Sequence, residues 1–128
     1  MGQRTNLQNR EVIGTAMGVL HGATVGVSWS NKSTGNFYVF SGTLGTSDAI
    51  TKMEVKNRST ANIVYVLGKP GGTIATSKAF RLRAGESYAF DLAQVAGGFF
   101  PTTISLQGSA SPATVDVTVW TTRPTTGY

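Results

Sequence analysis

The sequence has no cysteine, one histidine and few charged residues, and each shortage excludes a class of protein. Charged residues make up 13% of the chain, about half the share found in typical soluble domains. Without cysteine the chain has neither a disulfide framework nor a thiolate metal site. A single histidine and the lack of an Asp-rich calcium loop leave no recognisable metal site, so we expect neither a metal nor a cofactor.

Long hydrophobic runs are also absent. The longest ones, such as residues 63–67, fall far below the roughly 20 residues that a membrane-spanning helix needs, so we expect no membrane partner. Leu, Ile, Val and Phe nevertheless number 30 in 128 residues, which is enough for one core. The chain also has 29 Ser or Thr and 16 Gly. This polar, glycine-rich composition is typical of a single all-β domain.

Apolar residues recur at every second position in several segments, which is the pattern of strands with one buried face. Residues 51–55 alternate with the polar Lys52 and Glu54, residues 115–119 carry alternating valines, and residues 23–29 follow the same pattern. Residues 61–67 are apolar on both faces, as in a central strand. Together with shorter segments they predict an all-β fold, a single β-sandwich or jelly roll of about eight strands.

A hairpin and two arms complete the predicted organisation. Residues 79–83 and 87–92 flank Ala84-Gly85-Glu86, a three-residue connection with a central glycine that predicts a β-hairpin or a β-bulge. Residues 1–12 have no apolar period and are interpreted as an extended N-terminal arm, and residues 121–128 as a C-terminal tail without structure of its own. The sandwich domain is then expected over residues 13–120.

No pattern in the sequence predicts catalysis. His21 is in phase with Val19, Ala23 and Val25, and we interpret it as a hydrogen-bonded core or interface residue. No serine lies in a Gly-x-Ser-x-Gly turn, and the six acidic residues form no recognisable catalytic pair. Extended polar arms gain order chiefly when they dock on another protein. The sequence therefore favours assembly over catalysis, and the candidate contact residues are those of the two arms: Arg4, Asn6, Leu7, Arg10, Arg123 and Tyr128.

Two segments carry a family resemblance. Residues 55–68 (VKNRSTANIVYVLG) and 79–92 (AFRLRAGESYAFDL) resemble a pattern that recurs in virion proteins of tailed bacteriophages: a strand, a polar turn, an apolar strand, then a Gly-Glu-Ser turn. The resemblance implies a β-sandwich of the capsid decoration or head-fibre type. It also implies a non-catalytic protein that binds the major capsid protein, forms homo-oligomers such as trimers, and stabilises the virion.

Two other functions stay open on the sequence. The first is a carbohydrate-binding or receptor-binding appendage domain, which would need Trp29, Trp120, Tyr38 or Tyr128 exposed around a shallow groove. The second is a small nucleic-acid-binding coat protein, suggested by Arg81 and Arg83 beside aromatic residues. Because alternation places those arginines on a solvated face, we do not expect nucleic acid as the principal ligand.

Overall fold

A computed structural model describes residues 12–39, 42–45, 48–92 and 102–125 of the chain. These residues form ten strands and two short 3-10 turns. The elements are β1 (Val12–Val25), β2 (Ser30–Ser33), η1 (Thr34–Asn36), β3 (Tyr38–Val39), β4 (Gly42–Thr43), β5 (Ala49–Asn57), β6 (Val64–Leu67), η2 (Thr76–Lys78), β7 (Phe80–Leu82), β8 (Ser87–Asp91), β9 (Thr103–Gly108) and β10 (Ala113–Thr125). The predicted all-β fold is confirmed.

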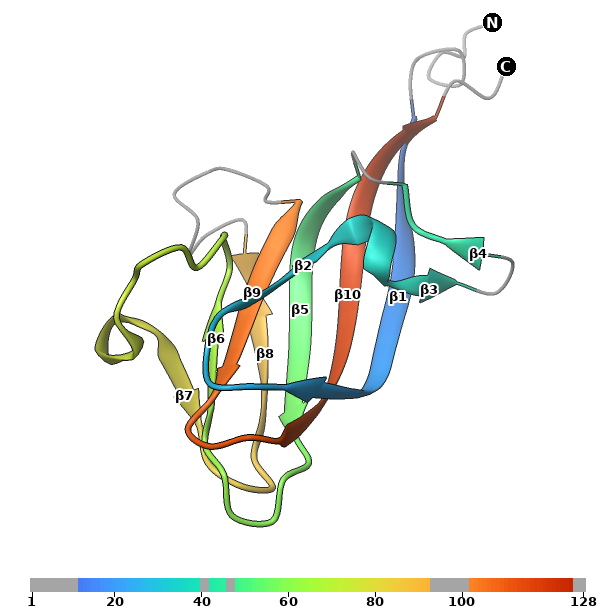
Figure 1. The fold of residues 1–128 in the computed structure, drawn as a ribbon. Helices are drawn as coiled ribbons and strands as arrows, with labels where there is room; N and C mark the ends of the chain where they lie inside the picture. The colour runs from blue at the N-terminus through green and yellow to red at the C-terminus, as the bar shows by residue number, and fades with distance from the viewer. Residues whose placement is uncertain (1–11, 40–41, 46–47, 93–101, 126–128) are drawn as a thin grey trace, which may run out of the picture.

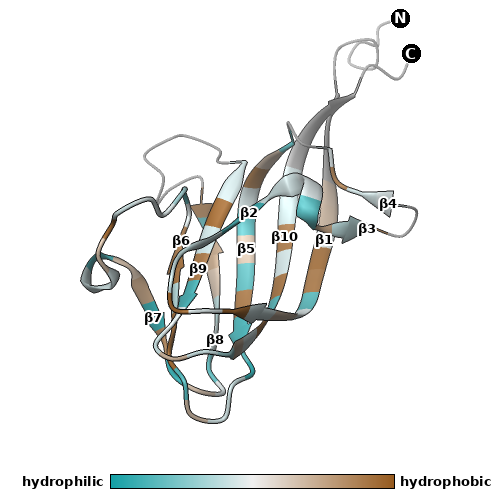
Figure 2. Ribbon diagram, viewed as in Figure 1, coloured by the Kyte–Doolittle hydropathy of each residue, from teal (hydrophilic) through white to brown (hydrophobic). Residues whose placement is uncertain are grey.

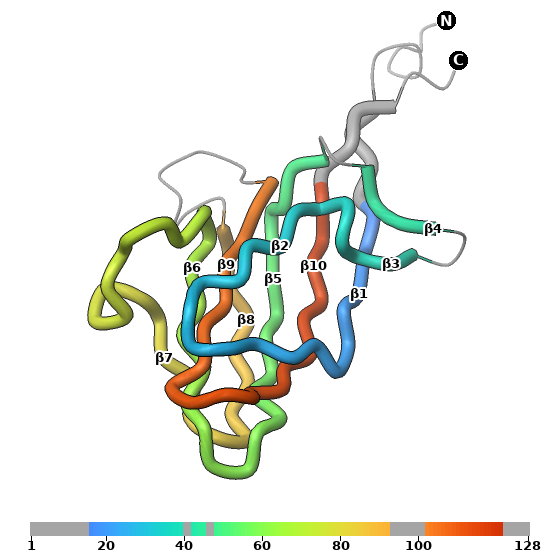
Figure 3. Tube along the Cα trace, in the orientation of Figure 1, coloured from blue at the N-terminus to red at the C-terminus, as the bar shows by residue number. Residues whose placement is uncertain are grey.

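The strands form two antiparallel sheets that pack face to face as a sandwich (Figure 1). One sheet has six strands in the order β4-β3-β1-β10-β5-β8, and the other has four in the order β2-β9-β6-β7. The chain crosses from one sheet to the other at most of its connections. The first and last strands, β1 and β10, are neighbours in the middle of the larger sheet and run together toward the marked chain ends (Figure 3). No helix in the described ranges is long and apolar enough to cross a membrane.

The core comes from the alternating positions that the sequence indicates. Met53 and Val55 of β5 are fully buried, as are Val115, Val117 and Val119 of β10. Val64 and Val66 of β6 and Ile104 and Leu106 of β9 face them from the smaller sheet. Apolar bands therefore alternate with polar ones along the strands (Figure 2). Burying each such side chain stabilises the fold by about 1.5–3 kcal/mol.

A bulge in β1 corrects the expectation that His21 is in phase with Ala23 and Val25. The register against β10 shifts between Leu20 and Ala23, and Gly22 adopts a left-handed φ of 69°. The Gly22 N–H donates to Asp116 Oδ1 at 2.7 Å, which fixes the bulge on β10. A bulge moves the following residues to the opposite face. His21 is therefore out of phase with Ala23 and Val25 and is exposed, so it is not a core residue; its interpretation as an interface residue stays a prediction.

The predicted strand over residues 23–29 is also displaced. β1 ends at Val25 and Val27 is 58% exposed. Trp29 lies at the connection to β2, where its Nε1–H donates to the carbonyl oxygen of Ile74 at 2.8 Å. Its ring packs so closely on Gly71 that a Cβ there would clash with it. Trp29 thus holds the connection between β6 and β7 against the sandwich through a hydrogen bond and close packing.

The predicted hairpin at residues 84–86 is wrong, because the two flanking strands belong to different sheets. β7 pairs with β6 in the smaller sheet, and β8 pairs with β5 in the larger one. The turn bonds to the end of β5 instead: the Gly85 N–H donates to the Asn57 carbonyl at 2.9 Å, and the Asn57 N–H donates to the Glu86 carbonyl at 2.8 Å. Gly85 has a φ of 82°, which suits a residue without a side chain. The connection is therefore a crossover between sheets.

The side chain of Asn57 holds this crossover in place. It is fully buried at the end of β5. Its Nδ2 donates to the carbonyl oxygens of Asn62 at 2.8 Å and Leu82 at 3.0 Å, and its Oδ1 accepts from the Ser59 N–H at 2.9 Å. One amide therefore links the β5–β6 connection to the end of β7.

The C-terminal tail is partly strand. β10 continues to Thr125, and its residues 121–125 pair with residues 12–16 of β1. This corrects the expectation that residues 121–125 lack structure of their own; the pairing supplies backbone partners that the sequence pattern does not reveal. Residues 1–11 of the predicted arm and 126–128 of the tail lie outside the described residues.

Replacing Asn57 with alanine is expected to destabilise the protein strongly. Asn57→Ala leaves the buried carbonyls of Asn62 and Leu82 without this donor, so the free energy of unfolding falls by about 2–3 kcal/mol. Thr60→Ala, at an exposed position of the same connection, is the control and should change it by less than about 0.5 kcal/mol. Guanidinium unfolding followed by tryptophan fluorescence measures both. Equal effects of the two substitutions would contradict the role assigned to Asn57.

Candidate contact surfaces

The structure leaves the sequence-predicted contact residues largely untested. Arg4, Asn6, Leu7, Arg10 and Tyr128 lie outside the described residues. Arg123 lies in β10, where its backbone is opposite Gly14 of β1. The candidate surfaces that the structure does describe come from other residues.

An apolar patch lies on the outer face of the six-stranded sheet. We call it the outer-face patch; it consists of Met17, Val19, Tyr38 and Trp120. Strand register brings these residues together, because Val19 is opposite Tyr38 of β3 and Met17 is opposite Trp120 of β10. Tyr38 is 60% exposed and Met17 52% exposed. Such contiguous exposed apolar residues mark interaction sites more often than isolated ones do.

Close packing on the inner face of β1 explains why these residues point outward. Gly18 is buried, and a Cβ on it would lie only 2.7 Å from Leu44 Cδ1 and 2.8 Å from Phe37 Cβ. Because side chains alternate along a strand, the residues on either side of Gly18, Met17 and Val19, face solvent. The sequence analysis did not predict this patch, because the glycines of β1 interrupt the alternating pattern of that strand.

A cation borders the patch. Lys52 of β5 lies opposite Trp120, and its Nζ is 5.0 Å from the centroid of the indole ring. A lysine at that distance over an exposed ring contributes about 0.5–1 kcal/mol. The contact also covers part of Trp120, which is half-buried. Met17 and Tyr38 are therefore the most accessible members of the patch.

The outer-face patch adjoins a two-stranded ribbon formed by β1 and β10. β5 pairs with β10 only as far as Thr122, and β3 pairs with β1 only at Val19. Within the described part of the chain, residues 12–14 and 123–125 therefore pair only with each other. Their outer backbone groups are left without a strand partner, as at the edge of a sheet.

A second surface lies where the sandwich is open between β7 and β8. Three aromatic rings line this opening. Phe80 is 39% exposed and Tyr88 is 54% exposed, whereas Phe90 is buried. The Phe80 centroid lies 4.8 Å from both the Tyr88 and the Phe90 centroids, and the Tyr88 and Phe90 centroids are 5.0 Å apart. Phe80 and Tyr88 reach solvent because their strands are edges of different sheets.

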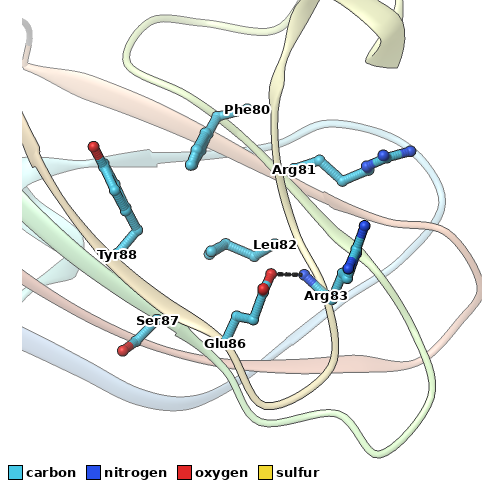
Figure 4. Close-up of a pocket in the computed structure, with 7 residues that line it drawn as sticks. All are labelled: Phe80, Arg81, Leu82, Arg83, Glu86, Ser87 and Tyr88. Atoms are coloured by element: carbon cyan, nitrogen blue, oxygen red, sulfur yellow. Dashed lines mark hydrogen bonds between the residues drawn. The ribbon is translucent and has the colours of Figure 1, made fainter.

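Two adjoining hollows share Phe80 and Tyr88, and we call them together the edge groove. One, of about 460 Å³, is mainly polar, and the residues that line it are Phe80, Arg81, Leu82, Arg83, Glu86, Ser87 and Tyr88 (Figure 4). The other, of about 470 Å³, is mainly apolar and lies over Val66, Gly68, Ala89, Phe90 and Leu92, with Asp91 at its margin. Glu86 is held in place, since its Oε1 accepts from the Arg83 N–H at 2.7 Å.

The described residues show little that could perform chemistry. They contain no group of three or more His, Asp or Glu residues that could hold a metal ion. His21 is exposed at the bulge, and the nearby Asp116 carboxylate bonds to Gly22 and to Arg58, the latter at 3.2 Å. Of the four aromatic residues considered for carbohydrate, Tyr38 and Trp120 share the outer-face patch. Trp29 lies instead against Gly71 and Ile74, and Tyr128 is not among the described residues.

Comparison with known proteins identifies the fold but no family. No protein-family model matches the sequence, and no curated protein matches it. A solved chain from Bacillus endospore appendages, described as a novel family of disulfide-linked pili, matches with a TM-score of 0.59 and 12% sequence identity. The match covers 99% of this chain and 100% of that one. Since this chain has no cysteine, it cannot form disulfide links of its own.

Substitutions of Phe90 and Tyr88 should distinguish the buried ring from an exposed ring by their effects on stability. Phe90→Ala removes a buried ring and is expected to lower the free energy of unfolding by about 3–5 kcal/mol. Tyr88→Ala removes a ring that is more than half exposed, and the expected loss is about 1 kcal/mol. Chemical unfolding of both variants tests this order. A Tyr88→Ala variant as unstable as Phe90→Ala would show that Tyr88 belongs to the core.

Proposed function

We propose that this protein is a non-catalytic structural subunit that docks on a larger protein assembly through the outer-face patch. The observation that carries the proposal is the exposure of Met17 and Tyr38 on one sheet face, where Tyr38 is opposite Val19, two residues along β1 from Met17. Exposed apolar surface costs about 25 cal/mol per Å² relative to burial, so covering the patch with another subunit is favourable. The flat outer face of an antiparallel sheet suits a broad protein contact.

The ribbon of β1 and β10 supports the same proposal. Two-stranded ribbons are marginally stable alone, because they lack a further strand or layer to pack against. Residues 12–14 and 123–125 extend beyond the pairing of β5, next to the outer-face patch. A neighbouring subunit that covers the patch could also provide partners for the ribbon. The terminal candidates Arg4, Asn6, Leu7, Arg10, Arg123 and Tyr128 would extend this contact.

The specific form we propose is a capsid decoration protein of a virion. Its partners would be the major capsid protein and further copies of itself, in a homo-oligomer such as a trimer. The β-sandwich fold and the resemblance of residues 55–68 and 79–92 to phage virion proteins support this form. The structural match to an appendage protein is compatible with a subunit role in general and supports no particular assembly.

A charge placed in the patch is expected to weaken association. Tyr38→Lys puts an ammonium group into the proposed contact, and we expect association to weaken by at least about tenfold. Tyr88→Lys is the matched control, because Tyr88 is similarly exposed, at 54% against 60%, but lies in the edge groove. Light scattering of the protein alone and with empty capsids measures the effect. Equal losses from the two substitutions would contradict docking through the patch.

Removing residues 1–11 is expected to weaken attachment and leave folding intact. The first described strand begins at Val12, so the shortened chain keeps every strand that the structure describes. Thermal unfolding should therefore be unchanged, whereas capsid attachment measured by co-sedimentation should be weakened. Full attachment of the shortened protein would exclude a role for Arg4, Asn6, Leu7 and Arg10 in docking.

A further inference from the structure

The edge groove has no part in the docking proposed above, and it combines features of a ligand-binding site. It lies between β7 and β8, which are edge strands of different sheets. Phe80 and Tyr88 keep 39% and 54% of their surface exposed at this opening. Its two hollows, of about 460 and 470 Å³, fall within the range of about 300–1,000 Å³ typical of small-ligand sites.

The exposed rings are held in fixed positions. Phe90 is 8% exposed and lies beneath them, nearly perpendicular to Phe80 at 86° and to Tyr88 at 87°. Such edge-to-face contacts are favourable, and they limit rotation of the two outer rings. A ligand that stacks on Phe80 and Tyr88 therefore meets a preformed surface and loses little free energy to ordering the protein.

The residues that line the two hollows also include hydrogen-bond donors and acceptors. Arg81 and Arg83 extend together from β7, away from Phe80 (Figure 4). Among the described residues neither guanidinium forms an ion pair, the one such pair being Arg58–Asp116. Glu86 has one oxygen fixed by the Arg83 N–H, which leaves its second oxygen available. Ser87 lines the same hollow, and Asp91 borders the other.

The charges of the groove select among ligands. Arg81 and Arg83 are balanced by Glu86 and Asp91, so the lining has no formal net charge. A phosphodiester chain carries a negative charge on every unit, and its binding relies on several uncompensated cations. A hydroxyl-rich ligand instead uses donors and acceptors equally. Because the rings and the guanidinium groups lie on opposite sides of β7, a ligand that contacts both must extend over the strand.

We propose that the edge groove binds an uncharged polysaccharide. The C–H faces of the sugar rings would stack on Phe80 and Tyr88, and hydroxyl groups would bond to Arg81, Arg83 and Glu86. A polysaccharide is long enough to contact both sides of β7. The proposal is independent of docking through the outer-face patch, which lies on another face of the molecule.

Affinity electrophoresis tests the proposal with soluble polysaccharides as probes. The full chain is run in gels that contain dextran, laminarin, xylan, galactomannan or hydroxyethylcellulose, and at least one of them should retard it. Tyr88→Ala should weaken that retardation by about tenfold, the effect of losing one stacking contact. Tyr88→Phe keeps the ring and should retain most of the binding. Val27→Ala, at an apolar position that is 58% exposed and lies outside both the edge groove and the outer-face patch, is the control and should bind as the unchanged protein does.

Four outcomes would overturn the proposal. They are no retardation by any of the uncharged polysaccharides, equal binding by Tyr88→Ala, equal losses in Val27→Ala and Tyr88→Ala, and retardation only in an additional gel that contains charged alginate. Binding of oligothymidine at low salt that disappears in Arg81→Gln would assign the groove to nucleic acid instead. Circular dichroism of each variant confirms that a loss of binding is not a loss of fold.

Discussion

The buried amide of Asn57 is the contact on which the arrangement of the two sheets depends. An unpaired amide in the core costs several kcal/mol, so its partners must remain within hydrogen-bond distance. Those partners are Asn62, in the connection between β5 and β6, and Leu82, at the end of β7 where the chain crosses to β8. Asn62 in turn donates to the carbonyl of Pro112 at 2.8 Å, in a third connection. One polar cluster therefore fixes three crossovers at the same end of the sandwich (Figure 1).

The open edge of the sandwich follows from that constraint. Because the turn at Gly85 bonds to the end of β5, the chain leaves the smaller sheet after β7 and enters the larger one at β8. The two strands thus face each other across the sandwich without pairing, and Phe80 and Tyr88 fill the space between them. The edge groove and the outer-face patch are consequently separate surfaces, which would let one subunit hold a protein neighbour and a second ligand together.

Local alternation was sufficient to predict the strands that are buried on one face. Met53, Val55 and the valines of β10 lie in the core as expected, and Lys52, Glu54 and Lys56 are exposed. Alternation failed where long-range hydrogen bonds decide the outcome. The Gly85 turn has the composition of a hairpin, and only its bonds to Asn57 direct β8 to the other sheet. The bulge at Gly22 likewise depends on Asp116, 94 residues away. Of the residues in the candidate surfaces, Tyr38 and Trp120 were named from the sequence only as candidates for carbohydrate binding, whereas Met17 and Phe80 required the strand order.

The pairing of β1 with β10 has a consequence for folding. The central pair of the larger sheet joins residue 12 to residue 125, so nearly the whole chain lies between two strands that are in direct contact. Closing so long a loop is entropically costly, and proteins dominated by such distant contacts fold slowly. During synthesis on the ribosome, the central pair of the larger sheet, β1 with β10, cannot form until β10 has emerged. Until then β1 has no partner along its β10 edge, and a chaperone or a nearby copy of the chain could bind it.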